Sequence, residues 1–379
     1  MLTWKQRNLR FLLSLAILLL FALRQVARED RPFTLRPDVR LLAYVANAGD
    51  GTISVVDLIR ASVVATVPVG PEPIELRMHP KEKQLWGLSR RGGYVWILDT
   101  KTNRILAQVP VGAEPAGMEF SADGAAVYVV SAGEGTLLLV DGHRQQIRRR
   151  VFLGGQPGMP KRTPDGRRLL VPDRTGNRVF VVEADTLQVA ATVPVVAQPE
   201  RVVLLPDGQR AFVTSSTKPE VSVIDLNRPT LVANLHLGTA EHSGPAGAAL
   251  KPDGGELYLP HPTAHGVTIL NTWTQEVAEF VVVGDAPAEV VITQDASWLF
   301  VVDRAAGRVT PVDVHTRRLH TPIPVGKRPA TAALTPGEEL LLVVNEGSND
   351  LAVIRKRTLS LLTLVPVGSG PRSLAVAML

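Results

Sequence analysis

The sequence contains no cysteine, which excludes disulfide bridges, thiol nucleophiles and cysteine-ligated metal sites. Aromatic residues make up only 5% of its 379 residues. The chain also lacks a Gly-x-Ser-x-Gly elbow, a phosphate-binding loop, a dinucleotide-binding fingerprint and a His-Glu-x-x-His motif. We therefore assign no catalytic residue from sequence motifs, and we predict no metal or other cofactor.

Most of the chain also lacks a net charge. Residues 1–40 hold eight basic and three acidic residues, which accounts for the whole net charge of +5. A nucleic-acid-binding protein carries its basic patch on the folded part. Nucleic acid is therefore not an expected partner.

One hydrophobic run stands out near the N-terminus. Thirteen uncharged residues, Phe11–Leu23, lie between Arg10 and Arg24. The run is shorter than the ~20 residues of a typical membrane span, but the flanking arginines can reach the interface. No Ala-x-Ala cleavage site follows it. We predict a hydrophobic helix that acts as a signal anchor within residues 1–28, with a cleaved signal peptide or a buried helix as alternatives.

The charges around this run set the expected topology. Lys5, Arg7 and Arg10 favour a cytoplasmic N-terminus. The chain is then expected to cross a bacterial inner membrane once. Residues 29–40 would form a short tether to a folded part in the periplasm or outside the cell.

The rest of the chain is an internal repeat. The Gly of a recurring Pro-Val-Gly stretch returns every 42 residues, apart from one step of 46 and one replacement by Val. The residue that ends each "GTISVVD"-type stretch follows the same steps. The Gly landmark lies at Gly70, Gly112, Gly154, Val196, Gly238, Gly284, Gly326 and Gly368.

Each repeat has the content of four β-strands. Short runs rich in Val, Leu, Ile and Thr alternate with turns of Gly, Pro, Asp and Asn, as in "ERVVLLPDG" (Glu200–Gly208) and "RAFVTSS". This pattern leaves no room for a helix. A four-stranded unit at this period is typical of a β-propeller blade.

The two ends of the repeat region complement each other. The residues before Gly70 supply the last three strands of a blade, and "PRSLAVAML" after Gly368 supplies a first strand. Pairing these ends would close the ring and remove open sheet edges. We therefore predict an all-β, eight-bladed β-propeller over residues 41–379, closed by its C-terminal strand.

The strand ends show a family resemblance. "YVAN" (Tyr44–Asn47), "YVVS" (Tyr128–Ser131), "FVTS" (Phe212–Ser215) and "FVVD" (Phe300–Asp303) resemble the Tyr-Val-Thr-Asn (YVTN) propeller repeat. The resemblance implies an extracytoplasmic bacterial or archaeal β-propeller. The count of eight blades also resembles the haem-binding propeller of cytochrome-type nitrite reductases, although no motif here carries that function over.

Departures from the repeat locate candidate sites, and the largest is in blade six. Its connection "GTAEHSGP" contains four extra residues and His242. His261 replaces a small polar residue, and His265 occupies a turn position. All three are binding-face candidates, because blade connections and the loops between second and third strands share one face. A metal or haem site and plain loop variation, since His tolerates left-handed turns, are the alternatives.

Blade four departs from the repeat in its innermost strand. Pro160 and Arg162 stand where other blades have apolar core residues. A buried Arg needs a partner, or it reaches the central channel with Lys161 beside it. Lys161 and Arg162 are binding-face candidates, and a distorted strand with a satisfied Arg is the alternative.

Blade three carries Arg148, Arg149 and Arg150 on its expected outermost strand. Charges on an edge strand block unwanted pairing, which is the structural interpretation. Contact with an acidic partner or with lipid headgroups is the functional one.

Three functions follow from these observations. The leading hypothesis is a membrane-tethered extracytoplasmic scaffold or accessory subunit without catalysis, which binds a protein partner, for example in a membrane complex. A lactonase-like hydrolase is the second, with Glu75, Arg201 and Glu289 at the channel mouth. A haem or metal carrier that uses the blade-six histidines is the third.

Overall fold

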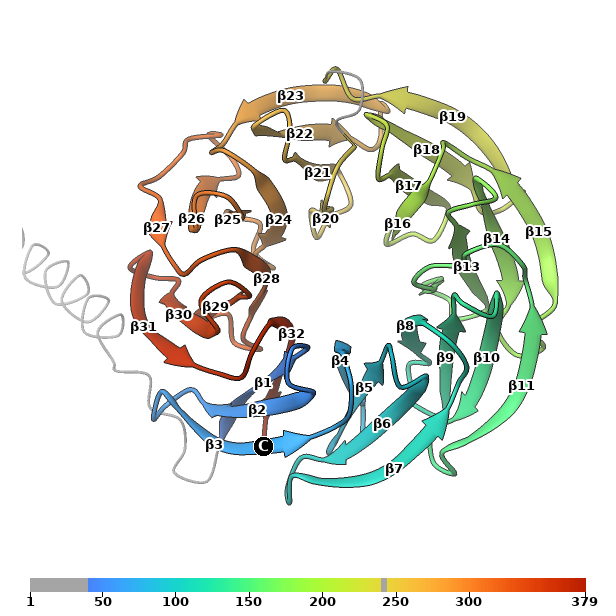
Figure 1. Ribbon diagram of the computed structural model, residues 1–379. Coiled ribbons are helices and arrows are strands. Elements are labelled where there is room, and N and C mark those ends of the chain that lie inside the picture. Colours follow the sequence, from blue (N-terminus) through green and yellow to red (C-terminus); the bar gives the residue numbers. More distant parts are fainter. Residues whose placement is uncertain (1–39, 240–243) are drawn as a thin grey trace, which may run out of the picture. The chain divides into compact units, whose positions relative to one another are not determined.

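The computed structural model describes residues 40–239 and 244–379, and every element in this part is a β-strand. The strands form eight four-stranded antiparallel sheets, which stand in a ring around a central channel (Figure 1). The predicted all-β, eight-bladed propeller is therefore confirmed. The predicted helix within residues 1–28 lies outside the described residues, as does most of the predicted tether.

Blades are numbered along the chain, and their strands are given from the channel outward. Blade one consists of β32 (Pro371–Met378), β1 (Leu41–Asn47), β2 (Thr52–Asp57) and β3 (Ser62–Pro68). Blade two is β4 (Pro73–Met78), β5 (Gln84–Ser89), β6 (Tyr94–Asp99) and β7 (Arg104–Pro110). Blade three is β8 (Pro115–Phe120), β9 (Ala126–Ser131), β10 (Thr136–Asp141) and β11 (Gln146–Phe152). Blade four is β12 (Lys161–Arg162), β13 (Arg168–Asp173), β14 (Arg178–Glu183) and β15 (Val189–Pro194).

The second half of the ring repeats this order. Blades five and six are β16 (Pro199–Leu204), β17 (Arg210–Ser215), β18 (Glu220–Asp225), β19 (Thr230–His236); and β20 (Ala249–Leu250), β21 (Glu256–His261), β22 (Gly266–Asn271), β23 (Glu276–Val282). Blades seven and eight are β24 (Pro287–Ile292), β25 (Trp298–Asp303), β26 (Arg308–Asp313), β27 (Ile323–Pro324); and β28 (Pro329–Leu334), β29 (Leu340–Asn345), β30 (Asp350–Arg355), β31 (Ser360–Pro366).

The ring closes as the sequence predicts. β32 pairs antiparallel with β1, so that Leu41 lies opposite Met378 and Asn47 lies opposite Pro371. Blade one is thus assembled from both ends of the repeat region. This pairing gives β1 the inner neighbour that each of the other blades takes from its own repeat.

The core lies between neighbouring blades. The second and third strands of each blade are covered on both faces, so their sequences are almost continuously apolar. Tyr44, Trp86 and Trp96 are among the largest fully buried side chains, and they lie on such strands. Burial on both faces explains why these strands alternate less than a one-sided sheet would.

Three strands have only two residues each, and each of them lies beside a strand that contains a proline. In blade four, Pro172 of β13 accepts a hydrogen bond from the N–H of Gly158 at 2.7 Å. The N–H and C=O of one residue in an antiparallel strand point to the same neighbour. The donor that Pro172 lacks would therefore have pointed to the innermost strand, β12, which is short.

The same relation holds for the other two short strands. Pro260 of β21 accepts from the N–H of Ala246 and lies beside the short innermost strand β20. Pro311 of β26 accepts from the N–H of His320 and lies beside the short outermost strand β27. Blades four and six therefore wall the channel less completely than the other blades.

Candidate functional site in the central channel

A cavity of about 760 Å³ lies in the channel, on the side of blades two to six. Its lining includes residues of blades four and six, the two blades with short innermost strands. Its ionisable lining carries more positive than negative charge. These lining residues are Arg90, Lys161, Arg162, Arg174, Arg201, Glu114, Glu119 and Glu200.

Ion pairs connect different blades along this wall. The Arg201 guanidinium of blade five lies 3.1 Å from the Glu289 carboxylate of blade seven, so the pair bridges across blade six. Arg174 and Glu200 pair between blades four and five. Arg201 and Glu289 therefore meet in the channel, as the hydrolase interpretation of the sequence required, but they neutralise each other.

Glu75, the third residue of that interpretation, belongs to a separate cluster on the blade-two side. Its carboxylate lies 2.8 Å from Arg77 Nε and accepts a bond from the N–H of Met118 at 3.1 Å. Burial raises the pKa of Glu75, and Arg77 and the Met118 N–H only partly offset this effect. Arg77 also lies 3.5 Å from Glu119 Oε2, a buried oxygen without a hydrogen-bond partner among the described residues.

The two blade-four candidates have different roles. Arg162 Nε donates to the carbonyl oxygen of Phe120 at 3.1 Å, so its guanidinium ties blade four to blade three. Lys161 also lines the cavity, but in the described part of the chain its ammonium group has no hydrogen-bond or ion-pair partner. Of the two, Lys161 is the residue whose charge is available to a ligand.

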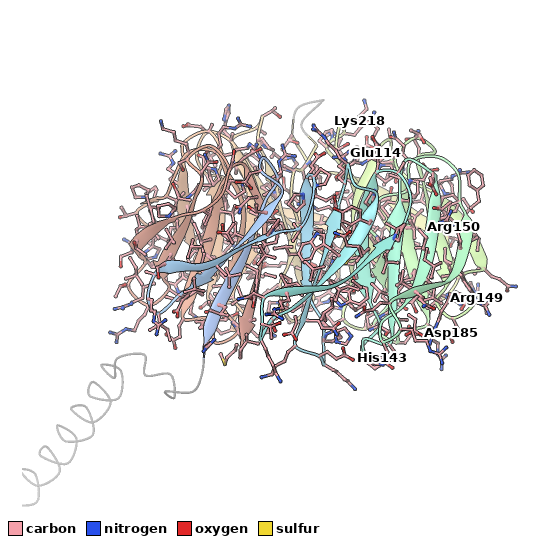
Figure 2. The ribbon with its side chains drawn as sticks, turned by 60° about the horizontal axis from the view of Figure 1, so that its bottom comes forward. Glu114, His143, Arg149, Arg150, Asp185 and Lys218 are labelled. Atoms are coloured by element: carbon pink, nitrogen blue, oxygen red, sulfur yellow. The ribbon has the colours of Figure 1, made fainter. Side chains whose placement is uncertain are left out.

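Three arginines gather around one glutamate on the face of the blade connections. Glu346 pairs with Arg304, Arg328 and Arg372, which come from blades seven, eight and one. This face of the propeller thus carries arginines and a glutamate that are paired with one another. Figure 2 shows Glu114 and Lys218 on the same face.

The blade-six histidines are not a cluster of free imidazoles. His261 is the last residue of β21 and is fully buried, with Nε2 3.0 Å from Thr268 Oγ1. His265 has a φ of 59°, and its Nδ1 contacts the carbonyl oxygen of Asp285. His242 lies outside the described residues. His261 is therefore not exposed on the binding face as its candidacy required, because β21 runs through it, and its buried, bonded ring does not fit a haem ligand.

The three arginines of blade three lie on the outermost strand, β11, as expected. Arg148 pairs with Asp141, and Arg150 pairs with Glu134 at 3.3 Å. Arg149 Nη1 contacts the carbonyl oxygen of Thr186 at 3.3 Å. Figure 2 places Arg149 and Arg150 on the outer rim, away from the channel.

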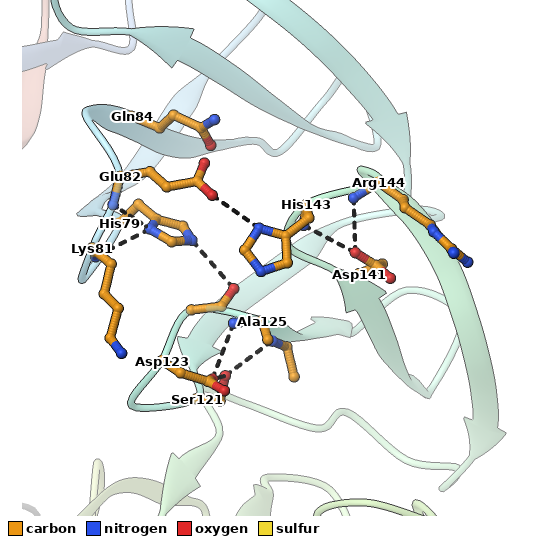
Figure 3. A network of polar contacts seen from close by, with 12 residues as sticks. His79, Lys81, Glu82, Gln84, Ser121, Asp123, Ala125, Asp141, His143 and Arg144 are labelled. Carbon is orange, nitrogen blue, oxygen red and sulfur yellow. Dashed lines mark hydrogen bonds and ion pairs between the residues drawn. The ribbon is translucent and has the colours of Figure 1, made fainter.

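Figure 3 shows another histidine pair, His79 and His143, which the sequence analysis did not single out, and Figure 2 places His143 on the opposite face. Buried His79 accepts hydrogen bonds at Nδ1 from the N–H groups of Lys81 and Glu82, and its Nε2 lies 3.2 Å from the Gly124 carbonyl oxygen. His143 Nδ1 lies 2.9 Å from Glu82 Oε1. These contacts join blades two and three, and His79 occupies the turn position that Ser121 holds in the next blade.

The described residues contain neither a metal-binding cluster nor a membrane-spanning helix. No group of three or more His, Cys, Asp or Glu side chains in residues 40–239 and 244–379 could hold a metal ion. No helix in this described part is long and apolar enough to span a membrane.

The comparisons with known proteins agree with the fold. The profile of the family described as "Lactonase, 7-bladed beta-propeller" matches residues 154–366, which is more than half of the chain. The ring described above has eight blades, one more than that description. No curated protein matches the sequence.

Solved structures of similar fold include a dihydro-haem d1 dehydrogenase, NirN, which is 16% identical with a TM-score of 0.76 over 91% of this chain and 77% of that one. AztD from Citrobacter koseri is 11% identical with a TM-score of 0.68, over 90% of this chain and 98% of AztD. Hydrazine synthase from Kuenenia stuttgartiensis is 22% identical with a TM-score of 0.60, over 75% and 95%. At these identities the likeness is one of fold.

Proposed function

The chain belongs to the lactonase, seven-bladed β-propeller family, and we propose that it is a membrane-tethered extracytoplasmic binding subunit. Its ligand site is the channel cavity, and its ligand is a small hydroxycarboxylic acid. A protein partner docks on the face of the blade connections around the channel mouth. The subunit itself contributes binding and no chemistry.

Lys161 is the observation that carries this proposal. Ligand sites are concave, largely preformed, and have a few polar groups that fix orientation. Arg201 and Arg174 in the cavity wall are each paired with a carboxylate, Glu289 and Glu200. Lys161 is left with an unmatched charge inside that wall, which suits a carboxylate of the ligand.

The tether rests on the sequence of residues 1–28. The uncharged run Phe11–Leu23 and the basic residues before it support a single-pass anchor with a cytoplasmic N-terminus. The YVTN-like strand ends support the same extracytoplasmic setting. An inner-membrane protein with its propeller in the periplasm is the arrangement that we propose.

Binding is tested with gluconate as the probe, by calorimetric titration of the full chain in detergent at low salt. We expect the wild type to bind, and Lys161→Gln to weaken binding at least about tenfold, or about 1.4 kcal/mol. Lys218→Gln is the matched control, because Lys218 lies on the face of the blade connections and not in the cavity wall. Equal binding by wild type and K161Q, or none by either, would contradict the site.

The tether is tested separately by N-terminal sequencing of the protein recovered from membranes. An intact start before Phe11 supports the anchor. A start between Arg24 and Thr34 would show that the segment is a cleaved signal peptide.

Hydrolysis of a lactone is a second candidate, favoured by the family match and by Glu119. Glu119 Oε2 faces Arg77 and has no hydrogen-bond partner in the described part. Its carboxylate would take a proton from water as the water oxygen attacks the lactone carbonyl. The bond to the ring oxygen then breaks, that oxygen takes the proton, and the product is a hydroxycarboxylic acid.

Proton release from δ-gluconolactone distinguishes the two candidates. A catalysed rate that Glu119→Gln abolishes would replace the binding subunit with a hydrolase. A rate equal to that of buffer, together with gluconate binding that depends on Lys161, supports the binding subunit.

A further inference from the structure

The outermost strands of the blades end in two different ways. Five of them end in proline, which cannot donate a hydrogen bond and so discourages pairing with another sheet edge. The others, β11, β19 and β23, end in Phe152, His236 and Val282. The protected ends are Pro68, Pro110, Pro194, Pro324 and Pro366.

β11 and β23 are also the most exposed of these strands. In both, every residue except the sixth is exposed. Phe152 is 76% exposed and Val282 is 65% exposed, and Phe280 of β23 also reaches solvent. Two strands without a terminal proline thus present apolar side chains at the rim.

The two strands carry opposite charges. β11 holds Arg148, Arg149 and Arg150, and β23 holds Glu276 and Glu279. Among the other outermost strands, which all lie in the described residues, the sole Lys, Arg, Asp or Glu is Arg104 of β7. Blades three and six are therefore set apart from the rest of the rim by a charge pattern that is complementary between them.

Part of this charge is not neutralised within one molecule. Arg149 contacts a backbone carbonyl, and Glu276 has no ion-pair partner among the described residues. Glu279 lies 3.7 Å from Arg317, at the outer limit of an ion pair. A second molecule could satisfy these groups.

A groove beside β11 provides space for the partner. It has a volume of about 560 Å³ and lies between Arg149–Val151 and Thr186–Val189. The arginines on the border of this groove attract acidic neighbours.

From these observations we propose that β11 of one copy of the protein docks on β23 of a second copy. Pairing β11 with β11, or β23 with β23, would place like charges opposite each other, which is unfavourable. Both strands carry a β-bulge, which blunts a continuous backbone ladder. Side-chain contacts between the basic and the acidic strand therefore hold the two copies together.

The proposed contact is heterologous, since two different surfaces meet. Each copy in a pair keeps one free β11 or β23, so further copies add until the ring closes or a filament forms. This inference is independent of the channel ligand and of the function proposed above.

Sedimentation velocity of the full chain in detergent at low salt tests the docking. We expect concentration-dependent association that weakens as salt rises. Arg149→Glu with Arg150→Glu, and separately Glu276→Arg with Glu279→Arg, should each raise the dissociation constant at least about tenfold. Arg104→Glu is the control on an outermost strand outside the proposed contact, and circular dichroism checks that each variant folds.

Mixing the two charge-reversed variants gives the decisive result. Each variant alone has two strands of like charge, but the acidic β11 of one matches the basic β23 of the other. Restored association in the mixture supports the proposal. A monomeric wild type, or variants that associate as the wild type does, would overturn it, as would arginine-dependent binding to anionic-lipid vesicles without restored association in the mixture.

Discussion

Blades four and eight are copies of the same sequence repeat, but only blade eight has a complete innermost strand. β28 runs from Pro329 to Leu334, whereas β12 consists of Lys161 and Arg162. The second strand of blade eight has Val344 where that of blade four has Pro172. Blade four thus lacks one backbone donor on its second strand, and Pro160 removes another from its innermost segment, where blade eight has Ala332.

Every repeat forms a four-stranded blade, and the blades with a two-residue strand are those with a proline in the neighbouring strand. Pro172, Pro260 and Pro311 each lie beside a two-residue strand. Two of the three prolines act toward the channel, and the cavity is on their side of the ring. The candidate site therefore depends on the short innermost strands of blades four and six as well as on the charged side chains that line the cavity.

Removing an innermost strand completely is the limiting case, and it should have the largest effect. Deleting Pro371–Leu379 leaves β1 with an unpaired edge and takes Ala375 and Ala377 from the core. We expect loss of the cooperative unfolding transition and rapid limited proteolysis. A truncated chain with the melting temperature of the full chain would show that β32 does not hold the ring closed.

Converting blade eight into blade four should have the next largest effect. Val344→Pro removes the donor toward β28 and is expected to lower the free energy of unfolding by about 3 kcal/mol. Val344→Ala keeps that donor and should cost about 1–2 kcal/mol. Hydrogen exchange should show lost protection in β28 for V344P alone.

The reverse substitution sharpens the same comparison. Pro172→Val restores a donor toward β12, and its stability should stay within about 1 kcal/mol of the wild type. Equal exchange rates in β28 for V344P and V344A would show that a proline in the second strand does not shorten the innermost strand.

A third contrast lies within blade six. His261→Ser should lower the free energy of unfolding by about 1–3 kcal/mol, because the buried Thr268 hydroxyl loses its imidazole partner. His265→Ser should be close to neutral, because His265 is exposed. Chemical denaturation of the two variants measures the difference, and a costly H265S with a neutral H261S would reverse our assignment of the buried residue.

The smallest effect concerns the turns between first and second strands, where blades three to seven have an Asp but blade eight has Gly337. Hydrogen bonds from Thr293 and Ser297 lower the pKa of Asp295 to about 2, from 3.8. A carboxyl whose pKa falls on folding stabilises the protein above its unfolded pKa. This contribution is therefore complete above about pH 4 and is lost as the pH falls toward 2.

Asp295→Asn tests this pH dependence. The variant should be less stable than the wild type at pH 5, and the difference should shrink by pH 2 to 3. Because Asp295 is exposed, salt should reduce the effect. A difference that does not change with pH would assign the loss to packing instead of charge.

The sequence predicted the number of blades and the closing strand because both depend on spacing alone. Arg162 was found because it breaks an apolar pattern at a fixed position, and Lys161 was found only as the neighbour of Arg162. The prolines in the second strands carried a signal for the short neighbours, but it needs the strand pairing to be interpreted. The Arg201–Glu289 pair joins residues 88 positions apart, and only the closed ring brings them together.

The burial of His261 could not be predicted for a different reason. A residue next to a turn can point to solvent or end a strand, and the repeat alone does not distinguish these cases. His261 pairs with Gly266 as the last residue of β21, and its imidazole contacts the hydroxyl of Thr268 on the neighbouring strand.

The pairing of β1 with β32 also has a consequence for synthesis. β1 emerges early, but its inner neighbour follows more than 300 residues later. At about 5–20 residues per second this interval lasts roughly 20–60 s, during which the edge of β1 has no native partner. Closing so long a loop is also slow. The inner edge of β1 is thus open to pairing with other chains until β32 has been made.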